Sequence, residues 1–241
     1  MPQTLILTGD LNFMGVTDPT VPFRKALADF KAADVRFANM ECCLYAPPTW
    51  QVWDNEGFMA DPGPGGECLR FAGIDAVGIA NNVNYGTEPI LTSIANLDSL
   101  GVAHTGAGAN NQLACAPALV TRNGLRAGVL QRSSVYWPTN HEAGPHTPGI
   151  AVLRGHTAYQ VPMHRARPEI PPMNRPGIPP TIITWADPKS LGQYKDDITA
   201  LGKDADIVIA SNHWGLFDDV LDSQVEIAHA AIDTGAAVVM G

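Results

Sequence analysis

The chain has 241 residues, 45% of them hydrophobic, and a formal net charge of −9. This length suits one large α/β domain or two small ones, and the acidic balance argues against nucleic acid or an anionic membrane surface as a partner. No apolar stretch is long enough for a membrane span. The first residues lack a basic region followed by an apolar stretch, so we expect a cytoplasmic protein, with export left open if the N-terminus was trimmed.

The first half of the chain alternates short apolar runs with helical patterns, as parallel α/β sheets do. Strands are predicted at 4–8, 35–38, 76–79 and 102–104, and helices at 22–30, around 68–71 and at 88–100. A loop rich in Pro, Gly and Trp spans about 46–66 and carries Trp50, Trp53 and Phe58. With the segment 135–138, these aromatic side chains could line an apolar substrate groove, or they could pack as small clusters under the loops.

The second half begins with a hairpin pattern, because Asn123-Gly124 separates the apolar runs 118–121 and 125–130. Residues 133–188 are rich in proline and are predicted to form a long irregular loop or flap. Further elements are predicted as a helix near 189–201, a strand at 206–210, a helix at 222–234 and a strand at 236–240. The sequence stops at Gly241 directly after that strand, so we expect a single domain over 1–241 that lacks its C-terminal part.

Four polar side chains come directly after four of the predicted buried strands. They are Asp10, Glu41, Asn82 and His213. Ligands bind outside the carboxyl ends of the strands in α/β sheets, so we expect these four side chains to converge. Two carboxylates, an amide and an imidazole suit a hard or borderline divalent cation. The sequence therefore predicts a divalent metal site, with Mn, Zn, Fe, Mg and Ca all left open.

Each candidate ligand also has an ordinary alternative. Asp10 and the Asn81-Asn82 pair could cap turns, and Glu41 could simply be solvated. His104 follows a short strand and could lie near the same site. The cysteines, which are Cys42, Cys43, Cys68 and Cys115, lack the spacing of a zinc-thiolate site and are interpreted as reduced thiols.

Several stretches together resemble the bacterial CapA, or poly-γ-glutamate synthesis, family, which is similar to the calcineurin-like metallophosphoesterases. The matching stretches are Thr8-Gly9-Asp10, Asn39-Met40-Glu41, 73–77, Ala80-Asn81-Asn82, 101–108, His213-Trp214-Gly215 and 231–236. The resemblance covers nearly the whole chain. It implies a four-layer α-β-β-α sandwich of two mixed sheets with helices outside. It also implies Asp10, Glu41, Asn82 and His213 as metal-site residues, with Glu41 placed to bridge two ions.

The sequence departs from the family pattern at two points. Val83 stands where family members commonly have a histidine, the position of a proton donor in related phosphoesterases. The family also continues past the last strand with a Gly-His-x-x-His-type segment, whereas nothing follows Gly241 here. Without a proton donor for the leaving group, simple phosphomonoester hydrolysis is disfavoured.

Three functions remain open from the sequence. The first is metal-dependent hydrolysis or transfer at an amide of a peptide or poly-γ-glutamate, as the resemblance implies, with His213, Glu41 and His104 as candidate catalytic residues. The second is metal-dependent epimerisation of a peptide by abstraction of a Cα proton, which needs no leaving group. The third is a non-catalytic capsule-assembly protein.

Overall fold

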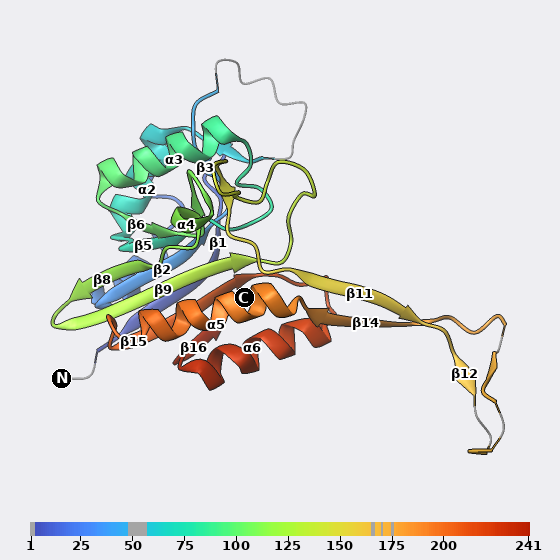
Figure 1. Ribbon diagram of the computed structural model, residues 1–241. Helices are drawn as coiled ribbons and strands as arrows, with labels where there is room; N and C mark the ends of the chain where they lie inside the picture. Colours follow the sequence, from blue (N-terminus) through green and yellow to red (C-terminus); the bar gives the residue numbers. More distant parts are fainter. Residues whose placement is uncertain (1–2, 48–56, 165–166, 170, 175) are drawn as a thin grey trace.

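The computed structural model describes residues 3–47, 57–164, 167–169, 171–174 and 176–241. In this part of the chain, two four-stranded sheets and several two-stranded ladders combine with six helices, so the predicted α/β class is confirmed (Figure 1). No helix among these residues has the length and apolar character needed to cross a bilayer.

The first sheet has the strand order β1-β2-β5-β6, and all of its neighbouring strands run parallel. Its members are β1 (Leu5–Leu11), β2 (Val35–Met40), β5 (Ala76–Gly78) and β6 (Ala103–Thr105). The helices α1 (Leu27–Ala32), α2 (Pro62–Ala72) and α3 (Thr87–Leu100) share a hydrophobic cluster with this sheet, in which Phe30, Leu69 and Leu97 pack with Val77 and Met40.

The second sheet has the order β16-β15-β9-β8 and is mixed. Its members are β8 (Ala118–Arg122), β9 (Leu125–Ser133), β15 (Ile207–His213) and β16 (Val238–Met240). The predicted hairpin is confirmed, because β8 and β9 pair antiparallel around Asn123 and Gly124, whose φ angles are 49° and 80°. The helices α5 (Pro188–Leu201) and α6 (Asp222–Thr234) pack against this sheet through Tyr194, Ile198 and Ile227.

A third hydrophobic cluster joins the two sheets. Val35 and Phe37 of β2 and Ala76 of β5 pack with Val129 of β9 and Ile209 of β15, and all five are fully buried. Within each sheet, neighbouring strands run parallel apart from β8, so their carboxyl ends lie at the same edge of that sheet. The carboxyl ends of β1, β2 and β15 meet at one rim, where the two sheets pack together.

Smaller elements accompany the two sheets. They are β3 (Cys43–Leu44) with β4 (Met59–Ala60), β7 (Ala107–Gly108) with β10 (Gly149–Ile150), and the short helix α4 (Asn111–Ala114). Two further ladders form an arm that extends from the body of the molecule (Figure 1). They are β11 (Gly155–Gln160) with β14 (Thr181–Ala186), and β12 (Met163–His164) with β13 (Met173–Asn174).

Four predictions need correction. The helix expected at 22–30 forms only over Leu27–Ala32 and follows a series of turns. The loop expected at 46–66 ends earlier, because Asp61 accepts a hydrogen bond from Gly63 N and starts α2 at Pro62. Residues 133–188 are not irregular throughout, since their prolines flank the paired strands β11 and β14. The first sheet is parallel rather than mixed over its described strands.

The aromatic segments fall partly outside the described residues, which do not include Trp50 and Trp53. Phe58 and Tyr136 pack against the hydrophobic cluster beside the first sheet. This packing favours the alternative in which these aromatic side chains form small clusters under the loops.

Candidate metal centre

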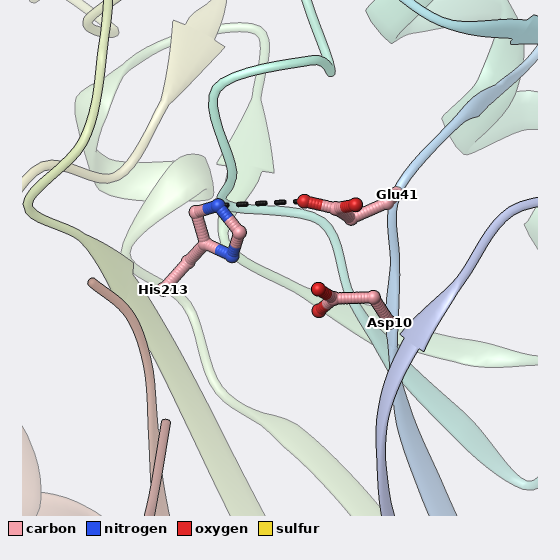
Figure 2. Close-up of side chains that lie close together, drawn as sticks. All are labelled: Asp10, Glu41 and His213. Carbon is pink, nitrogen blue, oxygen red and sulfur yellow. Dashed lines mark ion pairs between the residues drawn. The ribbon is translucent and has the colours of Figure 1, made fainter. Parts of the chain in front are cut away.

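Asp10 and Glu41 approach the rim from neighbouring strands of the first sheet. Asp10 lies within β1 and pairs in register with Asn39, after a register shift between Thr8 and Asp10 that re-aims the strand at Gly9. Glu41 follows β2 directly, and its backbone N donates a hydrogen bond to Leu11 O at 2.8 Å. The two carboxylates therefore point from adjacent strand ends toward the same space (Figure 2).

The sequence left two roles open for the paired asparagines, turn capping and metal ligation, and the two residues differ in which of these their positions suit. Asn81 forms a turn, because its Oδ1 accepts hydrogen bonds from Val83 N and Asn84 N at 3.3 and 3.0 Å. Its Nδ2 donates to Met40 O at 2.9 Å, which holds the turn against the end of β2. Asn82 is thereby presented to the rim, where its Oδ1 lies 2.7 Å from His213 Nε2.

His213 reaches the rim from the other sheet. It is the last residue of β15, and its backbone O accepts a hydrogen bond from Ser134 N at 2.9 Å. Its Nε2 lies 3.4 Å from Glu41 Oε1. Figure 2 shows the imidazole facing Glu41 with one nitrogen and Asp10 with the other. The predicted side chains Asp10, Glu41, Asn82 and His213 are thus brought together, although they come from distant parts of the sequence.

The geometry of this cluster fits a divalent cation. One ligand atom from each of Asp10, Glu41 and His213 can be chosen so that all lie within 4.8 Å of one another. Two ligand atoms bound at about 2.2 Å from the same ion stand at most about 4.4 Å apart. Small side-chain movements would therefore close the cluster around an ion, and the set of two carboxylates and one imidazole suits Zn, Mn or Fe.

Burial and charge perturb the two half-buried members of the cluster. Burial, and then the negative charge of Asp10, raise the pKa of Glu41 above its ordinary value. Burial lowers the pKa of His213, an effect that Asp10 opposes. His213 is therefore neutral near pH 7 and has a lone pair to offer, while the two carboxylates repel each other. A bound cation would relieve this repulsion.

Two buried amides, for which the sequence predicted no role, connect these residues. Asn39 Nδ2 donates to Asp10 Oδ1 at 2.6 Å and lies 3.4 Å from His213 Nδ1. Asn39 Oδ1 accepts hydrogen bonds from Asn81 Nδ2 at 3.1 Å and from Gln131 Nε2 at 3.0 Å. Since Gln131 belongs to β9 of the second sheet, this chain of amides links the two sheets directly beneath the cluster.

The side chain of Gln131 packs against the backbone of Gly78, a glycine of the first sheet. A Cβ atom built at Gly78 would lie 2.3 Å from the Gln131 side chain, so a larger residue there would displace the Gln131 amide from its present position. Gln131 Oε1 also accepts a hydrogen bond from Ala80 N at 2.7 Å. A polar residue near the end of the apolar run 125–130 and a glycine within the strand 76–79 were the signals in the sequence for this link.

The structure places His104 away from the cluster. It lies within β6, and its Nε2 is 3.2 Å from Asp98 Oδ1 of α3. Its contacts therefore give no support to the predicted catalytic role, which stays a prediction. Cys42 follows Glu41 but is fully buried, and burial raises the pKa of its thiol to about 12, so it offers no thiolate to the centre.

A loop from the second sheet anchors the turn that carries Asn82. The indole Nε1 of Trp137 donates to Asn82 O at 2.9 Å. His141, which is 1% exposed, accepts a hydrogen bond from Trp137 N at Nδ1 and donates from Nε2 to Asn84 O, at 3.0 and 2.9 Å. Its Nε2 must carry the proton, because a carbonyl oxygen only accepts.

The fold and this centre define an α/β protein with a candidate divalent-metal site at the rim between two sheets. The family model for the bacterial capsule synthesis protein PGA_cap matches residues 4–241. The chain therefore belongs to this capsule synthesis family, and the resemblance seen in its sequence is confirmed. A comparison with curated proteins finds no match.

Proposed function

We propose that this chain is a metal-dependent enzyme of the CapA type that hydrolyses or transfers an amide bond of a peptide or poly-amino-acid. The observation that carries the proposal is the convergence of Asp10, Glu41 and His213 from two sheets within 4.8 Å. Membership of a capsule synthesis family supports a polymer substrate. We also propose that the two sheets and their helices form the four-layer sandwich of calcineurin-like metallophosphoesterases, with Asn82 as a fourth ligand.

The bound ion would supply the Lewis acidity that polarises a carbonyl oxygen and lowers the pKa of a bound water. The residues of the chain would hold and orient it. Asp10 and Glu41 would provide negative charge, His213 a neutral nitrogen donor, and Asn82, whose Oδ1 lies 2.7 Å from His213 Nε2, an amide oxygen as the fourth ligand. The Asn39 amide would hold the Asp10 carboxylate in position through the 2.6 Å hydrogen bond from Nδ2 to Oδ1.

Metal analysis of the purified protein tests this proposal. We expect the wild type to contain a stoichiometric transition metal, and Asp10→Ala and His213→Ala to lose most of it because each removes one charge or nitrogen donor. Ser93→Ala is the matched control, since Ser93 is a buried polar residue that bonds Leu44 N and has no hydrogen bond to Asp10, Glu41 or His213. Equally negligible metal in all four proteins would contradict the enzyme proposal.

Peptide epimerisation is the second candidate, and one observation favours it. Val83 is buried, and its backbone groups bond Asn81 Oδ1 and Phe58 N, so its position offers no proton to a leaving group. Epimerisation has no leaving group and requires only that a base moves a Cα proton beside a polarised carbonyl. A hydrolase shortens a peptide substrate in D2O, whereas an epimerase leaves its length unchanged and introduces deuterium at Cα.

A further inference from the structure

A second feature of the molecule is an arm that takes no part in the metal centre. The arm, defined as residues 155–186, extends from the body and ends beyond β12 and β13 (Figure 1). Among the described residues, β11 and β14 pair as strands only with each other. The edge of β14 is covered at the base of the arm, where Ala186 N donates to Glu226 Oε2 of α6 at 2.7 Å, so its free edge lies further along the arm. An isolated two-stranded ladder is marginally stable in water, and free strand edges are templates for pairing with another chain.

The arm concentrates exposed apolar side chains. Those of the described residues are Tyr159, Val161, Met163, Met173, Ile178, Ile182 and Trp185. They are 40 to 69% exposed, and they lie on one segment rather than scattered singly over the molecule. Apolar side chains gathered in this way mark an interaction surface rather than an ordinary solvated loop.

A second apolar surface lies beside the base of the arm. The acidic loop, defined as residues 216–222, exposes Phe217 fully and Val220 at 77%. With Ile182 of β14, Leu216 and Val220 of this loop line a hollow of about 250 Å³. The loop begins three residues after His213 and ends at Asp222, the first residue of α6.

By sequence, the arm has a net positive charge and the rest of the chain a net negative charge. The arm contains three arginines and one glutamate, whereas the rest of the chain contains 12 basic and 23 acidic residues. The acidic loop itself contributes Asp218, Asp219 and Asp222, all of which are exposed. Because the body as a whole is acidic, it would be repelled by an anionic membrane but would attract the arm of another molecule.

We propose that the partner of the arm is a second copy of this chain. In a two-fold symmetric dimer the two arms lie antiparallel, so that the end of each arm reaches the acidic loop at the base of the other. Every contact between arm and loop then occurs twice, as an isologous interface requires. The free edges of β11 and β14 and the apolar side chains around them become buried between the copies.

Light scattering after size exclusion tests this proposal on the full chain. We expect the wild type to have twice its 25.6 kDa monomer mass, and the double variant Phe217→Ser, Val220→Ser to be monomeric. Leu119→Ser is the matched control, because Leu119 is an apolar residue of β8 that is 50% exposed and lies outside both surfaces. Circular dichroism checks that each variant is folded.

Reversing the charges of the arm and of the acidic loop tests whether these two surfaces contact each other in the dimer. Arg167→Glu in the arm and the pair Asp218→Lys, Asp219→Lys in the loop should each weaken the dimer by roughly tenfold, since each changed contact occurs twice. Combining the two changes should restore the dimer, because attraction returns with opposite signs. This rescue requires that arm and loop meet in the same assembly.

Three results would overturn the proposal. One is a wild type that stays at the monomer mass at about 100 μM, a concentration that would reveal even a weak dimer. Another is a dimer that the loop and arm variants leave unchanged. The third is a monomer whose arm binds vesicles with anionic headgroups, which would make a membrane the partner. None of these results depends on metal, so the proposed function is tested separately.

Discussion

The contacts between the two sheets change in chemical character from one end of the strands to the other. In the middle of this junction they are entirely apolar, with Phe37 and Val129 packed at 0% exposure. At the carboxyl rim they are made by amides, with Asn39 and Gln131 hydrogen-bonded across the sheets at 3.0 Å. At the opposite end, Asp75 at the start of β5 pairs with Arg36 of β2 and with Arg122 of β8 in the second sheet.

We expect the apolar contacts and the amide contacts to have different roles, the first in the stability of the fold and the second in the geometry of the site. Apolar packing is non-directional and tolerates small shifts between the sheets, whereas a network of amide hydrogen bonds fixes particular atoms at particular distances. The proposed metal centre needs such precision, because His213 comes from one sheet and its proposed fellow ligands come from the other. We therefore expect the apolar middle to hold the fold and the amide rim to hold the centre.

Removing the largest apolar side chain of the junction should have the largest effect. Phe37→Ala is expected to lower the free energy of unfolding by about 3–5 kcal/mol, because it leaves a cavity between the sheets. Below its melting temperature the variant should bind Mn²⁺ with little loss, which isothermal titration calorimetry would measure. A loss of metal affinity as large as that of the rim variants below would contradict this difference in roles.

The amide rim should behave in the opposite way. Asn39→Leu leaves Asp10 without its amide donor, and Asn81 and Gln131 without their acceptor. We expect Mn²⁺ affinity to fall about 10–100-fold and stability to fall by about 1–3 kcal/mol. Gln131→Met keeps the shape but removes the link between the sheets, so its effect on affinity should be smaller.

The control for both rim variants is Ser93→Ala, which removes a buried hydrogen bond between α3 and Leu44 N of β3. It should lower stability without changing metal affinity. If Ser93→Ala weakened Mn²⁺ binding as much as Asn39→Leu, the rim amides would have no special role in positioning the centre.

Much of this rim follows from the sequence, and the missing parts have a physical reason. Asp10, Glu41 and His213 stand at the ends of apolar runs, which is why their convergence was predictable. Asn39 and Gln131 are polar residues within or beside strands, where a pattern of apolar runs treats them as exceptions. Their roles became visible only when Gly78 and the second sheet were placed around the Gln131 side chain.

The arm was missed for a different reason. Apart from Ala186 at the base of β14, which packs in the core beside the second sheet, the apolar residues of β11 and β14 are exposed or only partly buried, so the alternation that marks a half-buried strand is weak there. The prolines between these strands favoured an irregular loop, but all of them lie outside the four strands of the arm, so none has to donate a ladder hydrogen bond.

The loop that holds the Asn82 turn at the rim should make stability depend on pH. Burial lowers the pKa of His141 below its ordinary value of 6.5. Above pH 6.5 this histidine is neutral in both the folded and unfolded states and costs nothing. As the pH falls from 6.5 toward the lowered pKa, only the unfolded state binds the proton, so the free energy of unfolding decreases.

His141→Gln isolates this contribution, because the glutamine amide can still donate and accept but does not titrate. Urea unfolding across this pH range should show a shallower decrease for the variant than for the wild type. The lowered pKa of His213 contributes a decrease of the same sign in both proteins. Identical slopes for the two proteins would show that His141 is not buried in its neutral form.

The ion pair at the opposite end of the junction should have the smallest effect. Asp75 is buried and keeps its pairing with Arg36 when Arg122, whose side chain is 54% exposed, is changed to alanine. Because an exposed partner gains little from pairing in water, Arg122→Ala should cost about 0.5 kcal/mol of unfolding free energy and leave Mn²⁺ affinity unchanged. Gln131→Met, which cuts the other link between the same two sheets, should instead reduce affinity. If both variants reduced metal affinity equally, the position of one sheet on the other would control the centre as a whole, and the amide rim would not be its specific support.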